Sequence, residues 1–147
     1  MRISAALLLM AAVFPGAAIA AEEAPLPGGL YEVTSRLELP HVERWAIDKK
    51  THVCFGAAAG GAIPLPVLSE NNPFRHCAAT ALVFENGRLE YDIACPGRAN
   101  ARAHAAYAIT PGRFSGRIEM VLGAKNMTMT EVQDAVRMGD CEATAQR

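Results

Sequence analysis

The sequence predicts a mainly β protein, an antiparallel meander that forms a curved sheet, a half-barrel or a small barrel and is stapled by two disulfides. Three observations support this prediction. Runs of alternating apolar and polar residues recur along the chain, turn signals separate them, and four cysteines follow an apparent export signal. Period-two alternation is typical of strands with one buried face. Successive hairpins of such strands form antiparallel meanders.

The first 20 residues have the features of a secretory signal peptide. Arg2 is followed by an apolar run and then by the small-residue triplet Ala18-Ile19-Ala20. Such a segment is removed on export, and the run is shorter than the roughly 20 apolar residues that a membrane-spanning helix needs. We therefore expect a periplasmic protein with no membrane insertion after cleavage. The expected organisation is a signal peptide over 1–20, a flexible segment over 21–29, one β-rich domain over 30–141 and a polar tail over 142–147.

Two strands are expected before the long irregular segment that follows Phe55. Residues 30–39 alternate between apolar and polar side chains, and residues 47–55 do so after a linker that contains Pro40 and Trp45. The side chains expected on the buried faces are Tyr31, Val33, Leu37 and Leu39 in the first strand and Ile47, Thr51, Val53 and Phe55 in the second.

The strongest local signal predicts a hairpin over 79–95. Two alternating runs meet at Asn86-Gly87, a dipeptide that suits a type I′ turn because both positions need positive φ. Two further strands, over 101–110 and 114–123, are expected on either side of a turn at 111–113. The alanines of the first of these favour a helix by propensity, but turn signals bound it at strand length and its apolar residues keep a period of two.

The segment over 126–141 is ambiguous. Met127 and Met129 alternate as in a strand, whereas Thr130, Glu131 and Asp134 could cap and charge a short helix. We expect a strand for its first part and leave the rest open between the two.

The four cysteines are expected to form two disulfides, because export places them where thiols oxidise. Four cysteines allow three pairings. We favour Cys54 with Cys77, which would close the long irregular segment, and Cys95 with Cys141, which would tie the C-terminus to a central strand. The Cys-x-x-Cys spacing of redox sites and the paired short spacings of zinc sites do not occur.

Two motifs give the chain a resemblance to a known family. The start Pro27-Gly28-Gly29-Leu30-Tyr31-Glu32-Val33-Thr34 and the end Gly139-Asp140-Cys141, with "YDIAC" and "FSGRI" strands between them, resemble domain-of-unknown-function family 3617, small exported proteobacterial envelope proteins. The likeness runs from Pro27 to Cys141, although members often carry Trp where this chain has Tyr31. The resemblance implies a periplasmic, disulfide-stapled, β-rich domain and no established activity.

Charge and motifs argue against several function classes. The chain has 14 Lys and Arg against 15 Asp and Glu, and removal of Arg2 with the signal leaves 13 against 15, a net charge of −2. Such a balance disfavours nucleic acid or an anionic membrane as a partner. We expect no enzyme and no cofactor, because the serines and histidines lie in no nucleophile motif and carboxylates such as Glu90 and Asp92 suit a solvated strand face. The serines and histidines weighed as catalytic candidates are Ser35, Ser69, Ser115, His41, His52, His76 and His104.

The favoured function is a non-enzymatic binding or interaction module, in which a curved sheet presents a concave face or cavity to a small apolar ligand or another periplasmic protein. The alternative is Cu(I) handling through methionines, because thioethers are soft ligands suited to Cu(I). Its candidates are Met127 and Met129, with His104 on a neighbouring strand, among the group that includes Met120 and Met138. Methionines also fill gaps in ordinary cores, and that reading is favoured.

Overall fold

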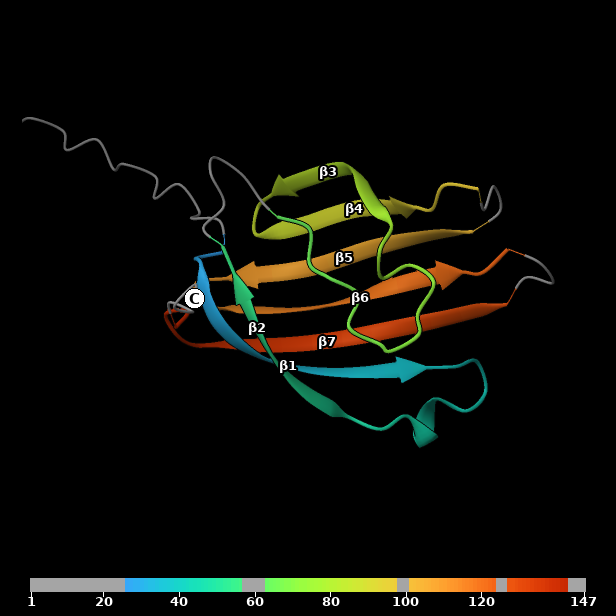
Figure 1. Ribbon diagram of the computed structural model, residues 1–147, viewed down its shortest axis with the longest axis horizontal. Helices are drawn as coiled ribbons and strands as arrows, with labels where there is room; N and C mark the ends of the chain where they lie inside the picture. The colour runs from blue at the N-terminus through green and yellow to red at the C-terminus, as the bar shows by residue number, and fades with distance from the viewer. Residues whose placement is uncertain (1–25, 57–62, 98–100, 124–126, 143–147) are drawn as a thin grey trace, which may run out of the picture.

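Seven strands pair in one antiparallel sheet in the computed structural model, which describes residues 26–56, 63–97, 101–123 and 127–142 (Figure 1). A short 3-10 helix, η1 (Glu43–Trp45), lies between the first two strands. The fold class is therefore confirmed as mainly β. The signal peptide expected over 1–20 lies outside the described residues, as do most of the expected N-terminal segment and tail. The strands are β1 (Gly29–Glu38), β2 (Lys49–Phe55), β3 (Ala78–Glu85), β4 (Arg88–Ala94), β5 (Arg102–Thr110), β6 (Arg113–Val121) and β7 (Thr128–Gly139).

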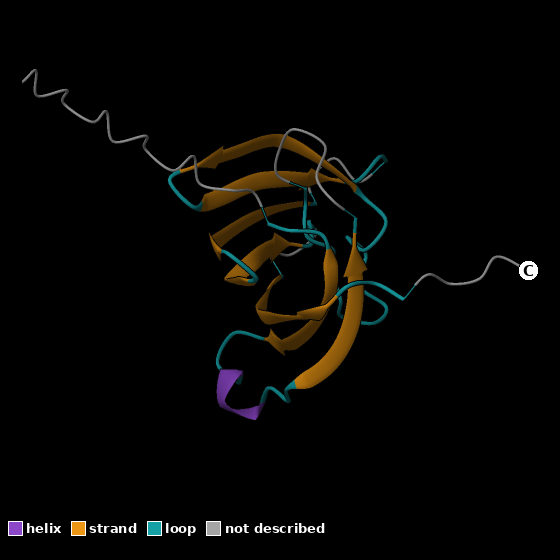
Figure 2. Ribbon diagram, turned by 90° about the vertical axis from the view of Figure 1, so that its left-hand side faces the viewer, coloured by secondary structure: helices purple, strands orange, loops and turns teal. Residues whose placement is uncertain are grey.

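The strand order is β2-β1-β7-β6-β5-β4-β3. A meander runs from β3 to β7, and the first strand then pairs with the last, so that β1 lies between β2 and β7. The sheet curls strongly (Figure 2) but does not close, because β2 and β3 remain its two edges. Of the three forms expected from the sequence, the closed small barrel is therefore wrong.

The predicted alternation decides which side chains face the concave side. In β5, for example, every odd position from Ala103 to Ile109 is buried, while most even positions are exposed. The Asn86-Gly87 turn has φ values of 50° and 70°, as a type I′ hairpin requires. Gly116 also faces this side, where a Cβ would collide with the ring of Tyr107, so the glycine makes room for that ring.

Two expected strand limits differ in the structure. β2 begins at Lys49, and Ile47 lies before it with 83% of its surface exposed, because it belongs to the connection that projects beyond β1. The ambiguous C-terminal segment is one continuous strand, β7, which pairs with β1 on one side and β6 on the other. Two ladders of hydrogen bonds override its local potential for a helix, since tertiary context outweighs propensity.

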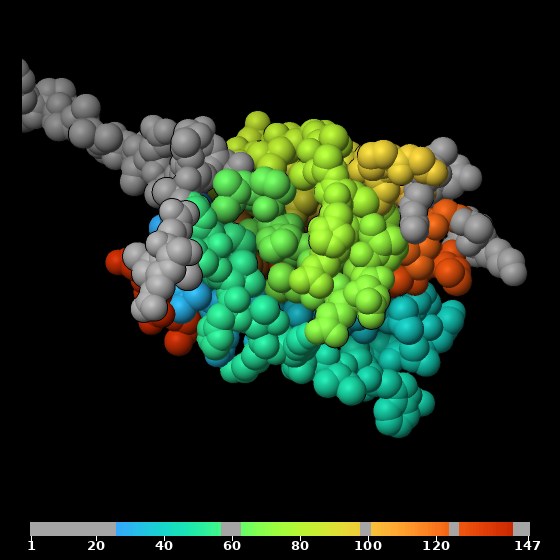
Figure 3. All heavy atoms as spheres, viewed as in Figure 1, coloured from blue at the N-terminus to red at the C-terminus, as the bar shows by residue number. Residues whose placement is uncertain are grey.

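The segment over 63–77, which we call the strap, crosses the concave side of the sheet without forming a strand (Figures 1 and 3). Its apolar residues Leu65, Val67 and Phe74 are buried in the core formed by the inward faces of the strands. The core on the sheet is aromatic at its centre, where Tyr107 contacts both Tyr91 and Phe114. The strap therefore closes the core that a half-open sheet would otherwise expose.

The disulfides are Cys54–Cys141 and Cys77–Cys95, so the favoured pairing of Cys54 with Cys77 and Cys95 with Cys141 is wrong. Cys77 directly precedes β3 and Cys95 directly follows β4, where Ala78 and Ala94 are paired across the hairpin. The Cys54–Cys141 pairing was not foreseen because it depends on contacts between distant parts of the chain.

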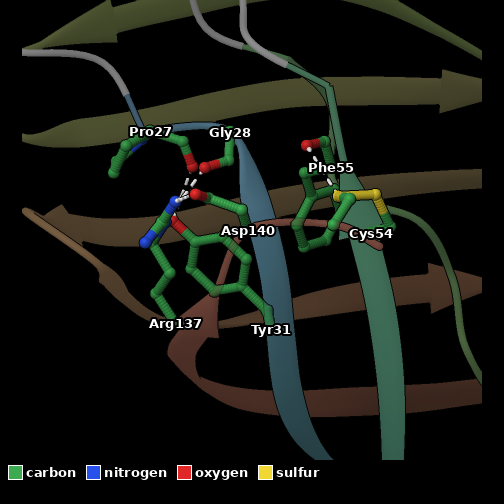
Figure 4. Close-up of polar contacts among 8 residues, drawn as sticks. Pro27, Gly28, Tyr31, Cys54, Phe55, Arg137 and Asp140 are labelled. Carbon is green, nitrogen blue, oxygen red and sulfur yellow. Dashed lines mark hydrogen bonds and ion pairs between the residues drawn. A yellow bond between two sulfur atoms is a disulfide. The ribbon is translucent and has the colours of Figure 1, made fainter. Parts of the chain in front are cut away.

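Cys141 lies next to Cys54 because β1 pairs on one side with β2, which contains Cys54, and on the other with β7, which ends just before Cys141. Leu30 pairs with Cys54 on one side and with Gly139 on the other, close to the point where β1 begins. The same corner holds Arg137, whose Nε donates to the Gly28 carbonyl at 2.9 Å, and Tyr31, whose hydroxyl donates to the Pro27 carbonyl at 2.7 Å (Figure 4). The disulfide therefore fastens the C-terminal end of the domain to β2, at the corner where hydrogen bonds hold the start of β1.

Candidate functional site

The centre of the concave face carries two polar residues of β7, Glu131 and Gln133, and neither side chain has any exposed surface. Glu131 accepts hydrogen bonds from the backbone N–H groups of Leu68 and Ser69, at 2.7 and 2.9 Å. The Ser69 hydroxyl donates to the same carboxylate at 2.5 Å, and so does Gln133 Nε2. Four donors therefore satisfy this buried carboxylate, three of them from the strap.

Tyrosine hydroxyls complete the attachment of the strap. Tyr91 donates to the Leu65 carbonyl at 2.7 Å, and Tyr107 donates to Gln133 Oε1 at 3.1 Å, while Gln133 Nε2 donates to the Pro66 carbonyl at 2.8 Å. Burial raises the pKa of the Tyr91 phenol, and burial is also the main cause that raises the pKa of Tyr107. Both phenols are thus neutral donors, and in the described residues no buried side-chain nitrogen or oxygen lacks a partner.

Beyond Ser69 in the strap, Asn72 lies over the methionines of the sheet. Its Nδ2 donates to the Ser69 hydroxyl at 2.7 Å and to the Met120 sulfur at 3.2 Å, while the Met129 sulfur is 3.8 Å away. Met120 and Met129 are direct cross-strand partners of β6 and β7. The cover that the strap gives to the concave face ends at this rung of the sheet.

One rung further, the concave face is open and forms a pocket of about 640 Å³ that we call the rim pocket. Leu122 N–H donates to the Met127 carbonyl at 2.8 Å, which extends the β6–β7 ladder beyond Met129. On the other side, Leu39 follows the last β1–β7 pair, Glu38 with Thr130. The residues that line the pocket are Leu39, Pro40, His41, Leu122, Met127, Thr128 and Met129.

The rim pocket keeps apolar side chains in contact with solvent. Leu39 is 45% exposed and Met127 57% exposed. The connection from β1 to β2, which contains His41, exposes Trp45 and Ile47 as well, and the Arg44 guanidinium lies 5.2 Å from the centre of the Trp45 ring. Grouped apolar exposure of this kind marks interaction sites more often than scattered single residues do.

The structure brings together only part of the predicted Cu(I) set. Met127 and Met129 share the concave side, as expected from their spacing, and both line the rim pocket. His104 lies on the outward face of β5, where its Nδ1 is 2.8 Å from the Asp92 carboxylate. The histidine that shares the pocket with the two methionines is His41. Met138 lies near the other end of β7 and is exposed.

The catalytic candidates are not assembled into a triad within the part of the chain that the structure describes. The Ser69 hydroxyl is bonded to Glu131, and Ser35 donates to the Lys49 carbonyl at 3.5 Å. The carboxylates Glu90 and Asp92 each contact a basic neighbour on the outward face, Arg88 and His104 respectively. Among the described residues, no three side chains of the His, Cys, Asp and Glu types are grouped so that they could hold a metal ion.

Comparisons with known proteins give no family or relative for this chain. No protein-family model matches it, and neither a curated protein nor a solved structure does. Over the described ranges, none of the helical structure is both long and apolar enough to cross a membrane.

Proposed function

We propose that this protein is an exported, non-enzymatic binding module that takes a small apolar ligand in the rim pocket. The observation that carries the proposal is the division of the concave face. Its centre is filled by the strap, whereas the apolar side chains of the rim remain uncovered beside a pocket of about 640 Å³. That volume lies in the range of pockets that bind small molecules, which is about 300–1,000 Å³.

The lining of the rim pocket suits an apolar ligand. Leucine, proline and methionine side chains make up most of it, and methionine adapts its shape to different partners. The space that remains between the strap and the β3–β4 hairpin is much smaller, about 120 Å³. A ligand of drug-like size therefore fits the rim and not the interior.

Two disulfides fit a protein that has been exported, because thiols stay oxidised outside the cytoplasm. We place the mature protein in the periplasm, in line with the signal peptide expected over residues 1–20. Mass spectrometry of the protein recovered from a periplasmic extract tests this. The expected result is a chain that starts at Ala21 and contains the two disulfides, whereas a full-length chain with free thiols contradicts it.

The ligand site is tested with a series of straight-chain alcohols from hexanol to dodecanol, added to the mature protein with its disulfides intact. The methionine ε-methyl groups report the contact by nuclear magnetic resonance. We expect the methyl signals of Met127 and Met129 to shift with saturation, and the Met138 signal to stay in place because it lies near the opposite end of β7.

A charged substitution distinguishes binding in the rim pocket from nonspecific binding of the alcohols to exposed apolar residues elsewhere. Leu39→Asp places a charge in the pocket at an exposed position and should abolish the shifts without unfolding the protein. Val83→Asp is the matched control, since Val83 is also an exposed apolar residue but lies on the edge strand β3. Equal binding by the Leu39→Asp protein, or no shift with any alcohol, would contradict the proposed function.

A further inference from the structure

We propose that the rim pocket also binds Cu(I), through the sulfurs of Met127 and Met129 and the imidazole of His41. The inference rests on the proposed function in one respect, which is that the ligand site is this pocket. It adds a second class of ligand, a metal ion, which does not follow from the apolar lining alone. The three residues lie in one pocket although His41 is separated from Met127 by most of the chain.

The two thioethers are placed to act together. Met127 and Met129 are two positions apart on the same side of the chain, so their Cβ atoms are separated by about 7 Å. Methionine is unbranched and has three rotatable bonds, which lets two such side chains converge on one point. Thioether sulfurs with an imidazole nitrogen form a soft donor set that suits Cu(I).

His41 is held at the pocket by its turn. Its φ of 70° lies in the left-handed region, and its backbone N–H donates to a carboxylate oxygen of Glu43 at 2.9 Å. The turn is closed by the Val42 N–H, which donates to the Leu39 carbonyl at 3.1 Å. Within the described residues the imidazole of His41 has no hydrogen-bond partner, so its nitrogens are available to a ligand.

Met120 defines the inner limit of the site. Its sulfur accepts a hydrogen bond from Asn72 Nδ2 at 3.2 Å, and the side chain is buried. A cation beside that N–H donor would face a positive partial charge. The Met129 sulfur makes a longer contact with the same amide, at 3.8 Å, so Met129, which also lines the rim pocket, gives up only this weaker contact when its sulfur turns toward Met127 and His41.

The lining also selects against harder cations. None of the residues that line the pocket is acidic, and Ca²⁺ and Mg²⁺ require carboxylate or carbonyl oxygens. Zn²⁺ sites in proteins use cysteine, histidine or carboxylate ligands, and only one of those side chains, His41, is present. The chemistry of the pocket therefore favours a soft monovalent ion.

The test is an anaerobic Cu(I) titration of the mature protein, with ascorbate as the reductant because it spares the disulfides and with bicinchoninate as the competing chelator. We expect one Cu(I) per chain, shifts of the Met127 and Met129 methyl signals and no shift at Met138. The Met127→Leu, Met129→Leu double variant should lose affinity by about 100-fold or more, because even an outer-shell change costs a metal site about 10- to 100-fold. His41→Ala should weaken binding as well.

Matched controls keep the test decisive. Met138→Leu and His104→Ala remove the same residue types elsewhere and should bind as the wild type does. Failure of the wild type to compete with bicinchoninate, or equal binding by the double variant, would overturn the inference. The leucines keep the pocket apolar, so an alcohol response that persists without Cu(I) binding would sink the copper site and leave the proposed function standing. Cu(I) binding without any alcohol response would support the copper site and contradict the apolar ligand.

Discussion

The covered centre and the open rim of the concave face are formed by the same strand, β7, yet they differ in what meets its side chains. At the centre, the inward residues Glu131 and Gln133 are polar, and the strap supplies their hydrogen-bond partners. At the rim, the inward residues Met127 and Met129 are apolar, and the strap does not extend over Met127, which stays exposed. Satisfied polar groups mark the part of the face that the chain closes by itself, and uncovered apolar groups mark the part that we propose takes a ligand.

The difference also shows how the strap is positioned. Apolar contacts of Leu65, Val67 and Phe74 favour burial but are not directional. The Glu131 carboxylate is directional, because two consecutive backbone N–H groups must both point at it. A strap shifted by one residue would lose this pair of hydrogen bonds. The buried carboxylate therefore fixes the register of the strap against β7 at Leu68 and Ser69.

The largest expected effect is at the centre. Glu131→Ala leaves the N–H groups of Leu68 and Ser69 without their acceptor in a buried site and should lower the free energy of unfolding by about 3–5 kcal/mol, measured by urea denaturation. Glu131→Gln, which keeps one acceptor oxygen, should fall between this variant and the wild type. A loss below about 1 kcal/mol for the alanine variant would show that the strap is held by apolar contacts alone.

The covalent attachment of the strap ranks next. The Cys77–Cys95 disulfide closes a loop with a sequence separation of 18. On the chain-entropy account, the double variant Cys77→Ser, Cys95→Ser should lose about 3 kcal/mol. Peptide mapping without reduction gives the control, since the Cys54–Cys141 peptide must persist in this variant. A linked Cys54–Cys77 peptide from the wild type would contradict the observed pairing.

The tyrosines make the covered centre sensitive to alkaline pH. Burial raises the pKa of Tyr91 and Tyr107 in the folded state, whereas an unfolded chain ionises its tyrosines near pH 10. The unfolded state therefore holds fewer protons above that pH. The free energy of unfolding should keep its full value below pH 10 and should fall as the pH rises further. Tyr107→Phe should cost about 1 kcal/mol at neutral pH and make the alkaline decline shallower. Ionisation of both phenols near pH 10 in a protein that keeps its native circular dichroism would contradict this.

Much of the sheet could be predicted from the sequence because its strands follow a simple rule. Alternation marked the buried faces of β5 and β6 and most of that of β1, although Leu39, expected on the buried face, lies beyond β1 and is exposed. Asn86-Gly87 marked the β3–β4 hairpin. The alternation of β7 could not be interpreted, because Glu131 and Gln133 face inward while Val132 and Val136 face outward. Only the strap makes that arrangement favourable, and a segment without periodicity gives no sign of where it packs.

The disulfide pairing was predicted wrongly, and the histidine that lines the pocket with the two methionines was missed, for related reasons. Cys77 and Cys95 lie at nearly equal distances from the Asn86-Gly87 turn, so the predicted hairpin itself contained the signal for their pairing. The Cys54–Cys141 pair required knowledge that β1 lies between β2 and β7, which no local pattern gives. The same long-range pairing places His41 in one pocket with Met127, whereas the sequence pattern indicated His104, on a strand that is nearer to Met127 along the chain.

The smallest effect on stability is expected at the rim, where it should accompany the clearest effect on binding. Met127 is 57% exposed, so Met127→Ala should change the free energy of unfolding by no more than about 0.5 kcal/mol. The same variant removes an apolar wall of the pocket and should weaken the alcohol response, while Met138→Ala, at a position 60% exposed outside the pocket, should change neither property. If Met127→Ala instead destabilised the protein as much as a core substitution does, about 2–5 kcal/mol, the rim would belong to the closed core. The division between a centre whose polar groups find their partners within the chain and a rim that is open to a ligand would then be wrong.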